Sequence, residues 1–326
     1  MLQKNTSAII TRLTALWALS ECALGGIMHA FKVPFTGIFV GGFAVVIIAL
    51  IAFNSENKFT SILRATLFVL MVKSGVSPHT PVPAYIAVAF QGFGGAIVFT
   101  LVSNYKIASV IFSFIAITES AIQKFLFTTL LFGKSFWTGI DAFVKSVLAD
   151  LHISNDFSFS VWAVSSYVLL YAVWGIAIGL FIGGMPKALE QIKTENIQIA
   201  QEDISIKKKK SMPKWVHYLL ISVFIVIVFY LDGKTNQAIY IILRSIAVTM
   251  ILFVIVRPLI VFLINKVGKN KQTEVNEILM LLPEIRKFVK PSFILAGKHF
   301  TGIKKYKYFV LYLIYFSTTG IDNAKK

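Results

Sequence analysis

The chain has 326 residues and a formal net charge of +17, and hydrophobic side chains occupy 56% of its positions. Its mean hydropathy is +0.76 and only 14% of its residues are charged, roughly half the share of an ordinary soluble domain. Continuous apolar runs of about 20 residues, the length that crosses a bilayer, recur along the chain. These features exclude a soluble globular domain and predict an all-α polytopic membrane protein, since helices satisfy their own backbone groups in lipid.

About eight transmembrane helices are expected in chain order. The first, "AIITRLTALWALSECALGGIMHA", carries Arg12 and Glu21 and lacks the apolar core and cleavage site of a secretory signal, so we expect it to remain in the mature protein. Near the end, "KYKYFVLYLIYFSTTG" has only about a dozen apolar residues, which favours an interfacial or re-entrant segment over a full span. The eight expected spans cover approximately residues 8–30, 35–53, 60–76, 82–103, 107–132, 160–184, 215–231 and 236–265.

The distribution of Lys and Arg predicts the orientation of these spans. Basic residues gather at the N-terminus, in the loops that follow every second span and in the C-terminal region. Because cytoplasmic loops are enriched in Lys and Arg, both termini are expected to be cytoplasmic. The loops around 30–34, 74–81 and 133–159 are then external. A bacterial-type inner (plasma) membrane is the expected location.

Charge also divides the chain into modules. Residues 1–185 contain ten basic and six acidic side chains, a net charge of +4, whereas residues 186–326 contain 22 and nine, a net charge of +13. We expect the basic excess to contact anionic lipid or an acidic cytoplasmic partner, and no nucleic-acid module accompanies it. The expected modules are a six-helix membrane unit (1–185), a basic cytoplasmic linker (186–214), a two-helix membrane hairpin (215–265) and a basic amphipathic cytoplasmic tail (266–326).

Two segments repeat a pattern at expected external helix junctions. "HAFKVPFTGIFVGGF" and "HTPVPAYIAVAFQGF" align His29 with His79 and Pro34 with Pro83, which indicates either a parallel duplication or chance similarity. The prolines of "SPHTPVP" disfavour regular helix. Irregular backbone at membrane depth is tolerated inside protein or along an aqueous cavity. His29, Lys32 and His79 are therefore candidate ligand-binding residues, the alternative being ordinary turns whose polar side chains reach water.

Three further polar residues fall within expected spans. Glu21 and Glu119 lie near the middle of the first and fifth spans, and Gln123 shares a helix face with Glu119. A carboxylate at mid-bilayer is expensive and usually faces a partner or a polar cavity. The functional interpretation is a proton- or ligand-linked carboxylate, and the structural alternative is a neutral glutamate hydrogen-bonded between helices.

A stripe of small residues runs along the first span, with members four positions apart: Thr14, Ala18, Cys22 and Gly26. Such stripes let helices approach closely. This one predicts either internal packing or a docking face for another membrane subunit.

No motif indicates catalysis, a cofactor or a metal. Cys22 is the only cysteine, which excludes an internal disulfide and a multi-cysteine metal site. His152 and Asp156 match no established metal-site spacing. The sequence contains no Ser/His/Asp signature, no zinc-protease motif and no phosphate-binding loop. We therefore expect neither an enzyme nor a chain that hydrolyses ATP itself.

Residues 1–185 resemble the substrate-binding (S) component of energy-coupling-factor (ECF) vitamin transporters. The resemblance lies in six spans with both ends cytoplasmic, the small-residue stripe, and polar external loops after the first, third and fifth spans. It implies a ligand site formed by His29, Lys32, His79, Tyr85, Gln91 and Trp137. The stripe of such components usually has two alanines four apart, whereas this chain has Ala18 and Cys22. The "AGKHF" segment is also not the Ala-Arg-Gly-type motif of the family's coupling subunit.

The sequence thus predicts a membrane transporter, or its substrate-capture subunit, for a small anionic or zwitterionic molecule bound at the external loops. Its expected partners are the lipid bilayer, the small-molecule substrate, and ATPase or coupling subunits. One alternative is a membrane scaffold that recruits a cytoplasmic partner through its basic C-terminal region. A second is a membrane-embedded lipid-modifying enzyme with His29 and His79 as acid/base groups.

Overall fold

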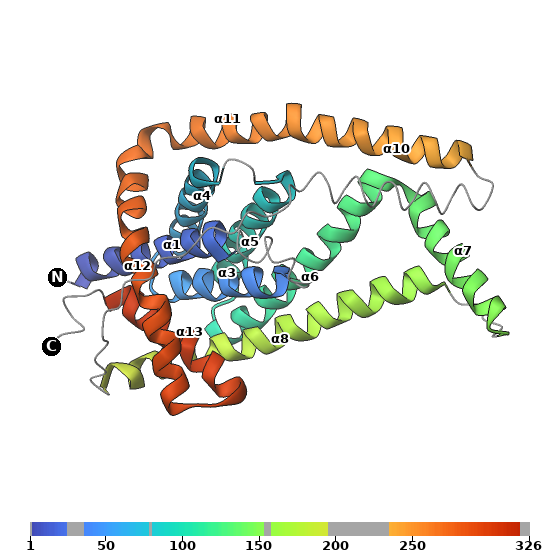
Figure 1. Cartoon of the computed structure of the whole chain (residues 1–326). Helices are drawn as coiled ribbons and strands as arrows, with labels where there is room; N and C mark the ends of the chain where they lie inside the picture. The colour runs from blue at the N-terminus through green and yellow to red at the C-terminus, as the bar shows by residue number, and fades with distance from the viewer. Residues whose placement is uncertain (1, 25–35, 78–79, 153–157, 195–234, 320–326) are drawn as a thin grey trace.

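The computed structural model describes residues 2–24, 36–77, 80–152, 158–194 and 235–319. Within these ranges the regular structure is entirely helical, which confirms the all-α prediction. Figure 1 shows the arrangement of the helices. In chain order they are α1 (Leu2–Leu19), the π-helical turn η1 (Ser20–Leu24), α3 (Thr36–Phe53), α4 (Lys58–Val76), α5 (Val82–Leu101), α6 (Tyr105–Phe132), α7 (Lys134–Asp150), α8 (Phe159–Thr194), α10 (Thr235–Met250), the π-helical turn η2 (Ile251–Val256), α11 (Arg257–Gly268), the short η3 (Lys269–Lys271), α12 (Gln272–His299) and α13 (Gly302–Thr319).

Five helical stretches in the described residues are long and apolar enough to cross a membrane. They are Lys58–Val76, Val82–Leu101, Tyr105–Phe132, Phe159–Ile192 and the compound helix Ile239–His299. A sixth apolar stretch, Gly37–Phe53, is shorter. The protein is therefore helical with several membrane-compatible helices. The expected seventh span, 215–231, lies outside the described residues.

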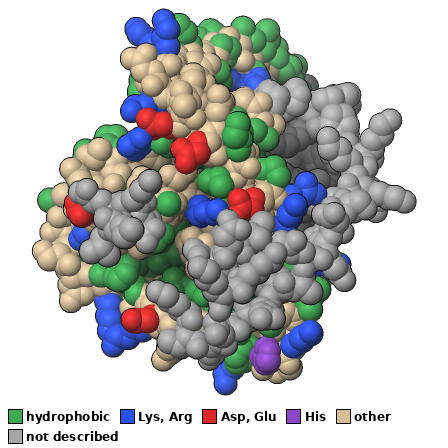
Figure 2. Space-filling view, turned by 90° about the vertical axis from the view of Figure 1, so that its left-hand side faces the viewer, with side chains coloured by type: hydrophobic (Ala, Val, Ile, Leu, Met, Phe, Trp, Pro, Cys, Tyr) green, Lys and Arg blue, Asp and Glu red, His purple; other side chains and the backbone are tan. Residues whose placement is uncertain are grey.

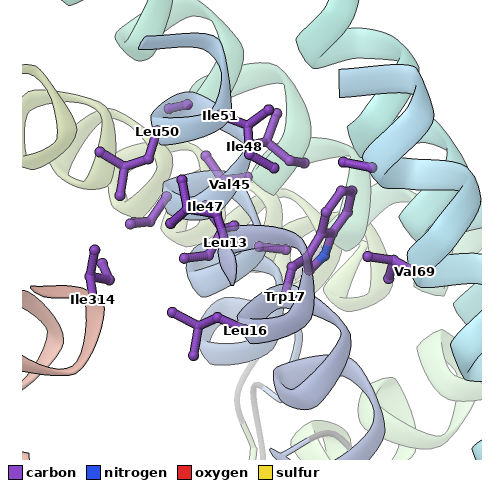
Figure 3. Close-up of a cluster of buried hydrophobic side chains, with 14 of the residues drawn as sticks. Leu13, Leu16, Trp17, Val45, Ile47, Ile48, Leu50, Ile51, Val69 and Ile314 are labelled. Atoms are coloured by element: carbon purple, nitrogen blue, oxygen red, sulfur yellow. The ribbon is translucent and has the colours of Figure 1, made fainter. Parts of the chain in front are cut away.

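The main apolar core of the described residues surrounds α3. Residues Ala44–Ala52 are buried on every side, as expected for a helix that is hydrophobic all round. Figure 3 shows α3 residues Ile47 and Ile51 meeting Leu13 and Trp17 of α1 and Val69 of α4. Ile314 of α13 belongs to the same cluster. Helices from both ends of the sequence therefore share one core.

Glycines bring α6 and α8 into close contact. A Cβ atom added at Gly179 would lie 2.5 Å from the Cα atom of Val110, and one at Gly175 would lie 2.8 Å from the carbonyl oxygen of Ser113. Gly183, four residues further along α8, lies beside Lys106 of α6. Small residues at this spacing let helix backbones approach within a membrane. This stripe, within "GIAIGLFIGG", played no part in the prediction.

The small-residue stripe on α1 is covered by the chain itself. Thr14 and Ala18 are fully buried among α3, α4, α12 and α13, and the Thr14 hydroxyl donates to the carbonyl of Ile10 at 2.8 Å. Cys22 is half-buried, and Gly26 lies outside the described residues. At Thr14 and Ala18 the stripe serves internal packing.

The C-terminal helices also belong to this body. α10, η2 and α11 form one long helix along an edge of the molecule, and α12 turns sharply away from it (Figure 1). The expected amphipathic segment 273–300 is α12, which buries one stripe that includes Ile278, Ile285 and Phe288. The expected interfacial or re-entrant segment is α13, whose second half, Leu311–Phe316, is largely buried against the core. The expected division into modules stays a prediction.

Two boundaries differ from the sequence-based expectation. α8 continues to Thr194, ten residues beyond its expected end, with Pro186 inside the helix. A proline removes one hydrogen bond, and the helix still extends because its remaining backbone bonds and its packing persist. The expected external cap at 133–159 contains an ordered amphipathic helix, α7, none of whose residues is buried.

Candidate functional site

A buried ion pair joins the ends of α1 and α4. The Lys73 Nζ atom lies 2.5 Å from Glu21 Oε2, and the two side chains are only 5% and 7% exposed. Glu21 sits in η1, the π-helical turn that continues α1, and Lys73 lies in the last turn of α4. Widened π-turns often occur at functional sites. Because charges inside a membrane protein are costly, a fully desolvated pair marks a candidate site.

An arginine faces the interior from the long helix along the edge of the molecule. In a regular α-helix the inward positions Ile241 and Ser245 would recur about six turns later, at Leu263 and Val267. Those two residues are exposed, whereas their successors Ile264 and Gly268 are buried. The π-turn η2 between them accounts for a register shift of one residue.

The shifted register determines which side chain faces inward. Arg257 lies two turns before Ile264 and on the same stripe, and it is partly buried, whereas Pro258 is exposed. Arg257 and Pro258 directly follow the π-turn, since Arg257 begins α11. The sequence Ile251–Pro258 thus presents a charged group to the bundle from an otherwise lipid-compatible helix.

Arg257 approaches the same end of the bundle as the ion pair. Tyr85, in the first turn of α5 and only 2% exposed, lies within electrostatic reach of both Arg257 and Cys22. Cys22 in turn lies within reach of Glu21 and Lys73. We call these five residues the charged cluster. Its Tyr85 Oη and Arg257 Nε atoms are buried and have no hydrogen-bond partner among the described residues, although Thr80 lies near Tyr85.

A second polar group lies between α3, α5 and α6. Gln91 is 2% exposed, and a Cβ atom at Gly41 would lie 3.1 Å from its Nε2 atom and 3.6 Å from Ser120 Oγ. The Oε1 atom of Gln91 and the Oε2 atom of Glu119 are buried without a partner in the described part of the chain. Buried polar atoms are normally satisfied, so these oxygens are free to bind water or a ligand. Gln123 instead donates to the carbonyl of Pro83 at 3.0 Å and ties α6 to α5.

Trp137 belongs to a separate aromatic cluster. Its indole Nε1 donates to Thr129 Oγ1 at 2.8 Å, and its ring contacts Phe125 and Phe136. These contacts fix the corner between α6 and α7 and occupy the indole donor. The structure therefore does not place Trp137 with Tyr85 in one site.

The corner between α7 and α8 is held by a carboxylate. Asp141 accepts hydrogen bonds from Ser158 Oγ and Ser160 N, both at 2.7 Å, and from Ser160 Oγ at 2.9 Å. Partial burial acts to raise the pKa of Asp141, but these hydrogen bonds outweigh it and hold the pKa below its ordinary value.

Three expected ligand residues, His29, Lys32 and His79, lie outside the described residues. The segments that carry them continue directly from η1 and α4, which hold Glu21 and Lys73. No group of three potential metal ligands occurs among the residues that the structure places.

The opposite ends of α1 and α4 carry the pocket that the structure describes. Its volume is about 540 Å³, and it lies between the starts of α1 and α4, the turn after α3 and the start of α12. Arg64 donates to Glu274 there, with the Arg64 Nε and Glu274 Oε2 atoms 3.0 Å apart, and Lys271 joins the same carboxylate. This pocket does not coincide with any of the expected ligand residues.

A second ion pair lies near that pocket. The Arg12 Nη1 atom lies 2.9 Å from Glu284 Oε1 and 3.3 Å from the carbonyl oxygen of Ser317, and it thereby joins α1 to α12 and α13. Figure 2, seen from this end, shows acidic and basic side chains next to one another on the surface. We call the Arg12 and Arg64 pairs the α12 clamps.

Sequence reasoning identified Glu21 and Tyr85 but missed Lys73 and Arg257. A signal was present for the arginine, because it is the only charged residue between Arg244 and Lys266. Lys73 resembles an ordinary residue at a helix end, and only its pairing with Glu21 reveals its burial.

Comparison with protein families, with characterised proteins and with solved structures finds no match.

Proposed function

We propose that the protein is a membrane transporter, or the substrate-capture subunit of one, for a small charged molecule that binds at the charged cluster. In this proposal the helix ends at Glu21 and Lys73 face outward, both termini are cytoplasmic and the chain makes about eight spans. Residues His29, Lys32 and His79, which belong to the two adjoining segments of the sequence, are further candidate ligand residues in the plan of an ECF-type S component.

The observation that carries the proposal is the desolvated pair Glu21–Lys73. Replacing a buried ion pair with apolar residues is often neutral or stabilising, so stability alone does not account for it. A charged ligand that competes for Lys73 or Glu21 would exchange one charge-assisted hydrogen bond for another. The site thus already holds charged groups that can bind a polar molecule.

The unpartnered oxygen of Gln91, which lies with Ser120 beside Gly41, supports a polar path deeper between α3, α5 and α6. Glu119 of α6 has a buried oxygen without a partner among the described residues and can carry a proton, so coupling to a proton gradient is one source of energy. Partner ATPases are the other.

The packing of α12 and α13 argues against a scaffold that works through a free basic tail. Both helices bury apolar stripes in the core shared with α1 and α3. For the membrane-embedded enzyme, the expected acid/base groups His29 and His79 lie outside the described residues, and no observation at the charged cluster favours this alternative.

An untargeted uptake experiment tests the proposal. Cells that express the chain, and cells that do not, are given a metabolite extract uniformly labelled with carbon-13, and labelled compounds inside the cells are identified by mass spectrometry. We expect at least one polar compound to accumulate only with the chain, and accumulation to fall at least tenfold when Lys32, His79 and Glu119 are neutralised together.

A matched control replaces the exposed lysines of α12, Lys287 and Lys290, with glutamine. The transporter proposal predicts unchanged uptake in this variant, whereas a scaffold predicts loss of function. Uptake that is unchanged when the three residues are neutralised would refute the proposal. The absence of any compound that accumulates only with the chain would also refute it.

A further inference from the structure

The charged cluster contains one positive charge more than it contains negative charges. Glu21 and Lys73 neutralise each other at 2.5 Å. Arg257 forms no ion pair in the part of the chain that the structure describes, and its Nε atom is buried without a hydrogen-bond partner. An arginine is always protonated, so it cannot escape the cost of burial by losing its proton.

The position of Arg257 argues against a role as a residue that simply reaches for the membrane surface. The π-turn η2 moves the inner stripe of the long helix by one residue, so that Arg257 shares a face with the buried Ile264 and Gly268. A residue that served only to reach lipid head groups would fit better on the outer face, beside the exposed Leu259 and Phe262.

A second buried polar group, Tyr85, lies within electrostatic reach of Arg257. Tyr85 is 98% buried, and its hydroxyl has no hydrogen-bond partner among the described residues. Arg257 and Tyr85 come from α11 and α5, where α5 meets η2. A guanidinium and a phenol hydroxyl together supply several donors and one positive charge, which suits an oxygen anion.

We infer that Arg257 and Tyr85 form the anchor of the charged cluster for a small organic molecule with a single negative charge, a monocarboxylate. This inference rests on the proposed function and narrows its ligand from anionic or zwitterionic to monoanionic.

Charge balance within the five residues of the charged cluster favours the monocarboxylate. One carboxylate matches one unpaired guanidinium and can accept two parallel hydrogen bonds from it. A phosphate monoester carries about −1.5 to −2 charges at neutral pH and would bring more negative charge than the five residues of the cluster compensate. A zwitterion would leave the arginine uncompensated. The phosphodiester of an anionic lipid also carries one charge, and the experiment must distinguish it.

The test measures thermal unfolding of the full chain purified in a neutral detergent. Sodium butyrate, sodium diethyl phosphate and sodium chloride are compared at the same ionic strength. A ligand that binds only the folded state raises the unfolding temperature, and we expect butyrate to raise it by roughly 2 °C or more over chloride. This shift is expected to disappear in Arg257→Gln and in Tyr85→Phe. The matched control Arg244→Gln, at a half-buried arginine on α10 that donates to the carbonyl of Leu130, is expected to keep it.

Cys22 supplies a second, local readout, because it is the only cysteine and lies within reach of Tyr85. Butyrate is expected to slow modification of Cys22 by neutral methyl methanethiosulfonate at least threefold in the wild type and in Arg244→Gln, but not in Arg257→Gln. Equal shifts in wild type and Arg257→Gln, or no shift with butyrate, would overturn the inference. A larger shift with diethyl phosphate would also overturn it and would assign Arg257 to a lipid head group.

These results separate the inference from the proposed function. An Arg257-dependent butyrate effect without chain-dependent uptake would leave the anion site standing and remove the transporter. Uptake that depends on Lys32, His79 and Glu119 but not on Arg257, without a butyrate effect, would support the transporter and refute the anion site at Arg257.

Discussion

Helices α1 and α4 carry ion pairs at both ends, and the two ends differ in their access to solvent. At one end Glu21 and Lys73 are 7% and 5% exposed. At the other end Arg64 and Glu274 are 54% and 30% exposed, and Arg12 and Glu284 are 22% and 25% exposed. The same kind of contact is therefore expected to contribute differently to stability at the two ends.

Exposure determines what each pair can contribute. An exposed pair has small net energy because water already solvates both charges, so the α12 clamps mainly position α12 against α1 and α4. A desolvated pair is costly to form and more costly to break. Such a pair is poor at adding stability, so its presence is better explained by a site that binds charged ligands.

The largest expected effect comes from removing one charge of the buried pair. Lys73→Met leaves Glu21 alone in an apolar interior and is expected to destabilise the protein by about 3–5 kcal/mol. The double variant Glu21→Met/Lys73→Met should recover most of that loss while abolishing ligand binding. Thermal unfolding in detergent and uptake measure the two outcomes. A double variant as unstable as the single one would mean that the pair is a structural element.

A smaller effect is expected at the partly exposed clamp. Arg12→Gln removes the contacts to Glu284 and to the carbonyl of Ser317, and should cost about 1–2 kcal/mol of unfolding free energy. Because this clamp is remote from the charged cluster, ligand affinity should not change. A loss of affinity in a stable Arg12→Gln protein would show that the two ends of α1 are coupled.

The exposed clamp is expected to matter less. Arg64→Gln should cost less than about 1 kcal/mol, and the difference from wild type should shrink as salt is raised, because exposed charges are screened. Unfolding measured at low and at high ionic strength checks this. A salt-independent loss larger than that of Arg12→Gln would contradict the ranking by exposure.

The smallest effect is expected at Asp141, which holds α7 against α8 outside the predicted spans. Its pKa is lowered from 3.8 on folding, so its contribution is present above the unfolded value and is lost as the pH falls through the lower folded value. Asp141→Asn should cost less than about 1 kcal/mol at pH 7 and should make the α7–α8 corner insensitive to acid below about pH 4. Hydrogen exchange of residues 158–162 reports this corner, and equal acid sensitivity in both proteins would contradict the assignment.

Local patterns were sufficient to predict most helices. The apolar runs over 35–132 correspond to α3–α6 within a few residues, because length and continuous hydrophobicity define such helices without tertiary information. The end of α8 was harder to predict, because Pro186 favours a helix end whereas the observed helix continues through it to Thr194. The positions of α12 and α13 could not be predicted, because their burial depends on contacts with α1, about 300 residues away in the sequence.

The candidate site was predicted only in part. Glu21 and Tyr85 were identified, but the partner of Glu21 required the crossing of α1 and α4. Arg257 was visible as a lone charge, yet only the π-turn determines the face on which it lies. Trp137 was assigned by resemblance, whereas its donor is occupied by Thr129. Helix register and the crossing of the helices thus determine which of these residues meet. Amino-acid composition encodes neither.

The most direct test of the central claim is mass spectrometry of small molecules released from the chain after mild purification from its membrane. Tyr85→Phe removes a buried hydroxyl that has no partner among the described residues, and Tyr105→Phe makes the same change near the other end of the bundle. The account predicts a carboxylate compound bound to the wild type and to Tyr105→Phe, and at least tenfold less of it on Tyr85→Phe. Equal amounts on all three proteins, or no bound compound on any of them, would contradict a ligand site at the charged cluster.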